Sequence, residues 1–261
     1  MALTRRRLAR EVVGVSRSPS TLRRARLCGA VDVGMIDSRR AVRSADLVVI
    51  ATPVDTIVPY ARRLAPCMRV GSILTDVGST KGEIVRALER TLPAHVAFVG
   101  AHPIAGSERR GFGAADARLF DGSFCVLTPT ARTPRAALRA VTQLWAPLVD
   151  RVITMSSHEH DRALAGMSHL PHLVAYCLAG SAKPHPLPRV PRSFLEMTRL
   201  AKSTPELWDD IFFSNRSELL AAMDRFEGRW RALRARLAHG DRAALRQLLR
   251  RAQSARDALH E

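Results

Sequence analysis

Short apolar runs alternate with amphipathic stretches along the first 155 or so residues of the chain. The run at 47–51 is apolar without interruption, which is typical of a strand buried on both faces. A helix is predicted from about Ser18, where Ser18 supplies a cap and Pro19 a first-turn proline. Strands separated by helices predict a mainly parallel, doubly wound α/β sheet. The runs that predict strands are residues 12–15, 47–51, 72–75, 96–99, 124–127 and 151–154.

After about residue 156 the apolar positions recur with helical periodicity, and no run typical of a strand remains. The proline-rich segment 183–188 cannot continue a helix and is predicted to be a loop. Helices are predicted near 157–182, 192–202, 205–238 and 241–259. We therefore predict two domains, an α/β domain of the nucleotide-binding type over residues 1–155 and an all-helical domain over 156–261.

The chain is strongly basic, with 41 Lys and Arg against 24 Asp and Glu and a formal net charge of +17. A basic balance of this size is also found in nucleic-acid-binding proteins. The arginines, however, run through every segment, and the densest stretch, 216–256, is interrupted by acidic residues, as in solvated helix faces. Neither zinc-finger spacing nor an aromatic-rich strand for stacking bases is found. This pattern argues against nucleic acid as the main ligand, and the positive charge would equally attract a small anionic substrate.

The distribution of apolar residues and cysteines bears on the compartment. No apolar run approaches the ~20 residues that a membrane span needs. No apolar stretch follows the arginines at 5–7, so we expect no secretory signal. The four cysteines stand singly, without metal or redox spacing. We therefore expect a reduced, cytoplasmic protein that does not associate with membranes.

Two polar residues follow predicted strands and could take part in chemistry. His102 lies between small residues in GAHPIAGSE at 100–108, where a ligand can approach the backbone closely. An imidazole there can take a proton near neutral pH, which suits oxidation of an alcohol, although it could also merely tie down its own loop. Ser79 could hydrogen-bond a substrate oxygen or this imidazole, or it could equally cap the helix that follows.

The helical half offers weaker candidates. His169 and His172 lie three residues apart, near His158 and His160, and residues with this spacing share a helix face. No cysteine or carboxylate nearby completes a recognisable ligand set, so we expect no metal site. By residue type alone, Arg199 is one of 38 arginines and Trp208 is a core residue.

Five short segments occur in one order along the chain: DVGSTKG at 76–82, HPIAGSE at 102–108, SHLPH at 168–172, TRLA at 198–201 and PELWDDI at 205–211. In this combination the chain resembles the prephenate/arogenate dehydrogenase family of tyrosine biosynthesis, from about residue 10 to about residue 235. The resemblance implies a Rossmann-like domain, with a doubly wound parallel sheet, followed by a helical substrate and dimerisation domain. It also implies a homodimer formed through the helical domain.

The resemblance implies oxidative decarboxylation of prephenate, with hydride transfer to a nicotinamide cofactor. His102 would accept the proton of the ring hydroxyl, and Ser79 would contact the same hydroxyl. Arg199 would hold a substrate carboxylate through its planar guanidinium. The substrate-binding positions implied in this way are Arg199, His172, Glu108 and Trp208.

The cofactor is expected at the carboxyl ends of the parallel strands, where Ser16, Arg17, Thr52, Pro53 and Asp76 lie. Ser16 stands where the family often has an acidic residue that bonds the ribose hydroxyls. Without that negative charge, and with Arg17 able to reach a 2′-phosphate, the chain is predicted to prefer NADP over NAD.

Two departures from the family pattern concern glycines. The family's glycine-rich turn before Arg199 reads VPRSF at 190–194, and no G-x-G-x-x-G precedes the run at 12–15. We therefore expect that the functional gene product begins upstream, with roughly 20–30 further residues that carry a first strand and this turn. The alternatives are an arogenate dehydrogenase that forms tyrosine, a non-catalytic truncated homologue and a basic nucleic-acid-binding protein.

Overall fold

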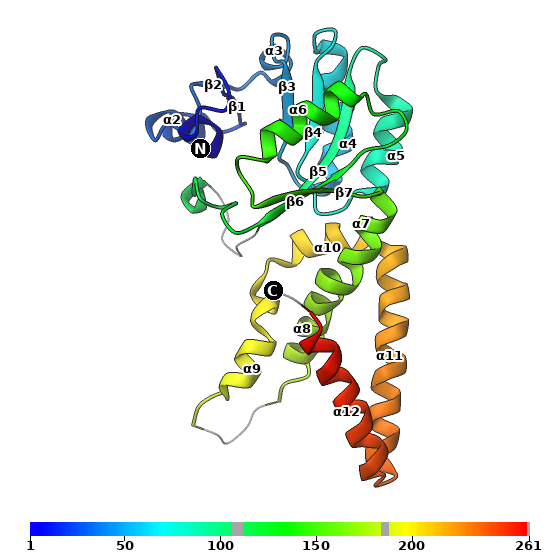
Figure 1. Cartoon of the computed structure of the whole chain (residues 1–261). Coiled ribbons are helices and arrows are strands. Elements are labelled where there is room, and N and C mark those ends of the chain that lie inside the picture. The colour runs from blue at the N-terminus through cyan, green and yellow to red at the C-terminus, as the bar shows by residue number, and fades with distance from the viewer. Residues whose placement is uncertain (106–111, 184–187, 260–261) are drawn as a thin grey trace. The chain divides into compact units, whose positions relative to one another are not determined.

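The computed structural model describes residues 1–105, 112–183 and 188–259 (Figure 1). The chain divides into two compact units, Met1–Asn215 and Arg216–Glu261. The domain boundary predicted between residues 155 and 156 lies inside the first unit and stays a prediction.

The described strands of the first unit form two sheets. β1 (Val13–Val15) and β2 (Val33–Met35) pair in parallel. The other sheet has the order β3-β4-β5-β6-β7 and is parallel except between β5 and β6. Its strands are Leu47–Ile50, Ile73–Asp76, Ala97–Ile104, Phe124–Thr128 and Arg151–Thr154. The predicted mainly parallel α/β architecture is confirmed, although β2 is missing from the prediction because its three residues include a glycine and form no apolar run.

Several helices of the α/β part begin where the sequence offers caps or prolines. The Ser18 hydroxyl accepts a hydrogen bond from the Thr21 amide (3.3 Å), and Pro19 is the first residue of its helix, which confirms the predicted start. Pro53 occupies the N-cap position of the helix that follows β3. These helices are α1 (Ala2–Arg5), α2 (Pro19–Leu27), α3 (Ser38–Ala41), α4 (Val54–Leu64), α5 (Gly82–Thr91) and α6 (Arg135–Trp145).

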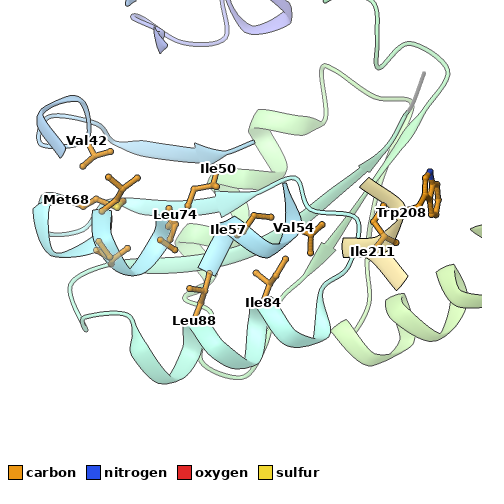
Figure 2. Packing of buried hydrophobic residues seen from close by; sticks show 14 residues of the cluster. Val42, Ile50, Val54, Ile57, Met68, Leu74, Ile84, Leu88, Trp208 and Ile211 are labelled. Atoms are coloured by element: carbon orange, nitrogen blue, oxygen red, sulfur yellow. The ribbon is translucent and has the colours of Figure 1, made fainter. Parts of the chain in front are cut away.

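Helices pack on both faces of the five-stranded sheet. On one face, Ile57 of α4 and Leu88 of α5 pack around Leu74 of β4, and all three are fully buried (Figure 2). The neighbouring residue Ile73 points to the opposite face, where α6 contributes the buried Val141. Burying a side chain of this kind stabilises the fold by about 1.5–3 kcal/mol. The two clusters hold the strands rigidly, and with them the loops at their carboxyl ends.

The rest of the first unit is helical: α7 (Ser157–Leu164), a π-helical turn (Ala165–His169), α8 (Leu170–Gly180), α9 (Arg192–Met197), a 3₁₀ turn (Arg199–Lys202) and α10 (Pro205–Ser214). The α7 start carries a reciprocal cap between Ser156 and Glu159. Trp208 and Ile211 of α10 join the cluster of α4 and α5 (Figure 2). The single helix predicted over 205–238 is wrong, because the backbone leaves the helical conformation at Asn215.

The second unit is a helical hairpin. It consists of α11 (Arg216–Ala238) and α12 (Arg242–Asp257). Gly240 between them has φ +67°, a left-handed conformation that favours glycine. The Asp241 side chain then accepts a hydrogen bond from the Ala244 amide (3.0 Å) and caps α12. No helix in the described ranges is both long and apolar enough to cross a membrane.

Candidate active site

His102 lies in the second half of β5, opposite Val126 of the antiparallel strand β6. The side chain is half-buried, and its Nδ1 lies 2.9 Å from Nε2 of His160. Burial lowers the pKa of His102 well below its ordinary value, and its electrostatic interactions with His160, Lys81 and His169 act in the same direction. The imidazole is therefore neutral at neutral pH and can accept a proton.

The partner of His102 comes from the beginning of α7. His160 is fully buried, and its Nδ1 lies 2.7 Å from Oδ1 of Asp161. The Asp161 carboxylate also accepts hydrogen bonds from the Lys81 amide (2.8 Å) and the Gly82 amide (2.7 Å). It thereby connects α7 to the start of α5. Sequence reasoning considered His160 only as a neighbour of a metal pair and did not find Asp161.

Ser79 lies half-buried in the loop between β4 and α5. Because α5 begins at Gly82 with Lys81 in the N-cap position, the alternative that Ser79 caps this helix is wrong. Asp76, at the end of β4, is fully buried and accepts hydrogen bonds from the Gly78 amide (2.9 Å) and the Ala101 amide (3.3 Å). Asp76 also forms an ion pair with the buried Lys81. The carboxylate of Asp76 therefore fixes the start of the loop that carries Ser79.

Two further histidines meet Trp208 of α10. The His172 ring stacks on the indole with centroids 3.5 Å apart, and His169 approaches its edge at 6.1 Å. His169 is the last residue of the π-helical turn and His172 follows it. This turn contains one residue more than an α-helical turn, so it rotates the positions of the residues that follow around the helix axis. The Asn215 amide nitrogen lies 2.7 Å from the Asp161 carbonyl oxygen and 3.1 Å from Nδ1 of His169. Trp208 is thus a core residue whose indole also packs against the His172 ring.

Arg199 begins the 3₁₀ turn that packs against α8, which carries His172. Its side chain is exposed, and its positive charge contributes to lowering the pKa of His172, after burial. The turn is held in place by the Tyr176 hydroxyl, which donates a hydrogen bond to the Ser203 carbonyl (2.6 Å). Arg199 and His172 therefore lie on neighbouring elements, whereas Glu108 falls outside the described residues.

The residues predicted to bind the cofactor follow parallel strands. The Ser16 hydroxyl, after β1, accepts a hydrogen bond from the Ser18 amide (3.2 Å), and Arg17 is exposed beside it. Thr52, after β3, is exposed and accepts a hydrogen bond from the Thr56 hydroxyl (2.8 Å), so its own hydroxyl proton is free to donate. Hydroxyl donors and one guanidinium at these ends fit the phosphates and ribose of a dinucleotide, while Pro53 shapes the start of α4.

No group of three or more His, Cys, Asp or Glu side chains that could hold a metal ion occurs within residues 1–105, 112–183 and 188–259. Of the histidines considered for such a site, His160 and His169 are engaged in hydrogen bonds with protein groups.

Comparison with known proteins identifies relatives along nearly the whole chain. Residues 1–154 match the family model for the prephenate dehydrogenase nucleotide-binding domain, and residues 156–251 match that for the prephenate dehydrogenase dimerization domain. Cyclohexadienyl dehydrogenase of Zymomonas mobilis is 37% identical over 243 residues, which are 90% of this chain and 83% of the relative.

Solved structures also share the fold, among them two enzymes of this kind. Prephenate dehydrogenase from A. aeolicus, in complex with hydroxyphenyl propionate and NAD+, superposes with a TM-score of 0.89 at 30% identity. The match covers 98% of this chain and 91% of that chain. Synechocystis arogenate dehydrogenase superposes with a TM-score of 0.84 at 26% identity, over 98% of this chain and 94% of that chain.

Proposed function

We propose that this chain, which belongs to the prephenate dehydrogenase family, oxidises prephenate with a nicotinamide dinucleotide in tyrosine biosynthesis. The observation that carries the proposal is the state of His102: a neutral imidazole on β5 whose Nδ1 is directed at His160. The other ring nitrogen, Nε2, is left to face a substrate. A neutral imidazole of this kind is the group that oxidation of an alcohol requires.

The reaction moves one proton, one hydride and one carboxyl group. A nicotinamide held at the carboxyl ends of the parallel strands would supply the acceptor for the hydride that leaves the ring carbon carrying the hydroxyl. The hydroxyl proton passes to Nε2 of His102, and the ring carboxylate leaves as carbon dioxide, so that its bonding electrons complete the aromatic ring. The product is then a phenolate, and it takes the proton back from His102 to give 4-hydroxyphenylpyruvate. Since aromatisation drives the reaction, the side chains mainly position the substrate and hold the proton.

Substrate binding is assigned to the side chains around this base. Ser79 donates a hydrogen bond to the ring hydroxyl, and Arg199 binds a substrate carboxylate through two parallel N–H groups. His172, held flat against Trp208, lines the side-chain end of the pocket. Glu108 is assigned to the same pocket on the family resemblance. The exposed position of Arg199 beside α8 supports its role, because an incoming anion can reach it.

The nicotinamide cofactor is proposed to be NADP in preference to NAD. An acidic side chain at the end of β1 would repel a 2′-phosphate, and this chain has the neutral Ser16 there. Arg17, exposed beside it, can reach such a phosphate as a charge-assisted donor. Thr52 and Pro53, after β3, border the rest of the proposed dinucleotide site. The buried Asp76, the last residue of β4, supports this site indirectly, through the loop whose Gly78 amide it binds.

The working form is proposed to be a homodimer assembled through the helical part of the chain. The match of residues 156–251 to a dimerization domain supports this assembly. Exposed apolar side chains on several helices also support it, among them Phe213 (69% exposed) and Trp230 (60% exposed). Apolar side chains of this size are more often covered than left in water.

The test is a steady-state assay of the purified chain with prephenate and arogenate, each combined with NAD and NADP. Formation of reduced cofactor from prephenate, with a higher kcat/KM for NADP, is the expected result. Turnover of arogenate alone would replace the substrate assignment. No reduced cofactor with any of the four combinations would contradict the proposed function.

A further inference from the structure

A chain of hydrogen bonds leads from His102 into the interior of the first unit. His102 Nδ1 lies 2.9 Å from His160 Nε2, and His160 Nδ1 lies 2.7 Å from Asp161 Oδ1. This series of hydrogen bonds ends at the Asp161 carboxylate, which also accepts hydrogen bonds from the Lys81 and Gly82 amides. His160 is fully buried and Asp161 is 5% exposed, so water does not compete for these bonds.

The order of these groups fixes where the protons lie. An ionised carboxylate only accepts hydrogen bonds, so Nδ1 of His160 carries a proton and donates it to Asp161. In a neutral His160 ring, Nε2 is then an acceptor, and the proton between the two rings belongs to Nδ1 of His102. His102 is left with a lone pair on Nε2, which is the nitrogen assigned to the substrate.

The reverse arrangement would block the reaction. It requires His160 to be a buried cation that donates from both nitrogens, or Asp161 to be protonated. In either case His102 would accept at Nδ1 and carry its proton on Nε2. Such a ring could donate to the ring hydroxyl but could not take its proton.

We propose that His160 and Asp161 are positioning residues that hold His102 in the tautomer with Nδ1 protonated and Nε2 free, and that stabilise the imidazolium formed when His102 accepts a proton. The proposal rests on the proposed function of His102 as the base. Neither His160 nor Asp161 touches the substrate. Their contribution resembles that of a buried carboxylate that orients a catalytic histidine in hydrolases.

The same carboxylate also fixes the loop of the second hydroxyl-binding residue. Asp161 holds the Lys81 and Gly82 amides, two and three residues after Ser79. A Cβ atom at Gly82 would lie 2.8 Å from Asp161 Oδ2, so a glycine is needed for the carboxylate to approach this closely. One side chain thus sets the position of both groups that are proposed to contact the ring hydroxyl.

The tautomer can be read directly in the resting protein by long-range ¹⁵N–¹H NMR of the histidine-labelled full chain, with His102→Gln to assign the His102 signals. The expected spectrum shows His102 protonated at Nδ1 and unprotonated at Nε2. A His102 ring protonated at Nε2 would overturn the proposal. This measurement needs no substrate, so its outcome is independent of whether the chain oxidises prephenate.

Two substitutions at one position separate the hydrogen bonds from mere packing. In His160→Gln the side-chain oxygen can still accept from His102 and the amide can still donate to Asp161, and kcat is expected within about tenfold of wild type. In His160→Leu both bonds are lost, and kcat is expected to fall about 10²-fold or more. His158→Gln, an exposed position on the same helix, is the control and is expected to change kcat less than about twofold.

The two variants must differ for the proposal to stand. Equal kcat values for His160→Gln and His160→Leu would overturn it, because the hydrogen bonds would then have no effect on the base. If His160→Leu does not fold, the NMR spectra of wild type and His160→Gln still decide, since both are expected to show the same His102 tautomer. An inactive wild type would instead contradict the proposed function and leave the spectrum as the test of the tautomer.

Discussion

Acidification is expected to destabilise this protein through the buried side chain of His169. The ring is 1% exposed, and its Nδ1 faces the amide nitrogen of Asn215 at 3.1 Å. That amide nitrogen also bonds the Asp161 carbonyl oxygen, so it can only donate toward His169. Burial lowers the pKa of His169 to about 4, against a partial opposing effect of the Asp161 carboxylate. A proton on Nδ1 would place two donors face to face in the interior.

The sign and size of the effect follow from the two pKa values. In the unfolded chain His169 titrates near 6.5, so below that pH the unfolded state binds more protons than the folded state. Stability is therefore present at neutral pH and is lost as the pH falls from 6.5 toward about 4. The difference between the two pKa values corresponds to roughly 3 kcal/mol in the free energy of unfolding, of which about 2 kcal/mol is lost between pH 7 and pH 5.

Urea unfolding of wild type and His169→Gln at pH 7 and pH 5 measures this contribution. Glutamine can accept from Asn215 through its side-chain oxygen but does not titrate. Wild type is expected to lose about 2 kcal/mol more free energy of unfolding than the variant over this interval. Other histidines titrate in both proteins, so their effects cancel in the difference. If both proteins lose the same amount, the assignment of a depressed pKa to His169 is wrong.

Three further substitutions test other parts of the site. Arg199→Ala is expected to raise KM for prephenate about 10- to 100-fold in steady-state assays and to leave kcat nearly unchanged, because a carboxylate contact stabilises the ground state and the transition state alike. An unaltered KM would show that Arg199 does not bind the substrate. Ser16→Asp is expected to lower kcat/KM for NADP about 10- to 100-fold while NAD is spared, and a wild type that already prefers NAD would refute the cofactor choice. Lys81→Met leaves the buried Asp76 carboxylate without its cation and is expected to lower the free energy of unfolding in urea by about 3–5 kcal/mol. An unchanged urea concentration at the unfolding midpoint would show that the ion pair is not stabilising.

The sequence predicted most of the sheet because its strands are apolar runs bounded by polar or small residues. All five strands of the larger sheet, β3 to β7, were found in this way. Two features of the sheets were not predicted. The three-residue β2 carries too little apolar surface to stand out, and hydrophobic patterning does not reveal that β6 runs antiparallel to β5.

The proposed base, His102, could be predicted from its neighbours in sequence, but the residues proposed to support it could not. His102 lies among small residues that the sequence places after a strand, although β5 in fact continues through His102 to Ile104. His160 comes from 58 residues further along and meets His102 only through the tertiary fold. Asp161 and Asn215 likewise act through contacts that no local pattern shows. The one local signal was the Ser156–Glu159 cap, which marks a helix start just before His160.

That His102 accepts the ring-hydroxyl proton is tested most directly by the kcat of His102→Asn with prephenate, measured together with cofactor Kd by nucleotide fluorescence. Asparagine keeps a side-chain amide near His160 but cannot take up the proton. The expected result is a kcat about 10²–10⁴-fold below wild type, with Kd for the cofactor nearly unchanged. A His102→Asn protein with wild-type kcat would contradict the assignment of the base.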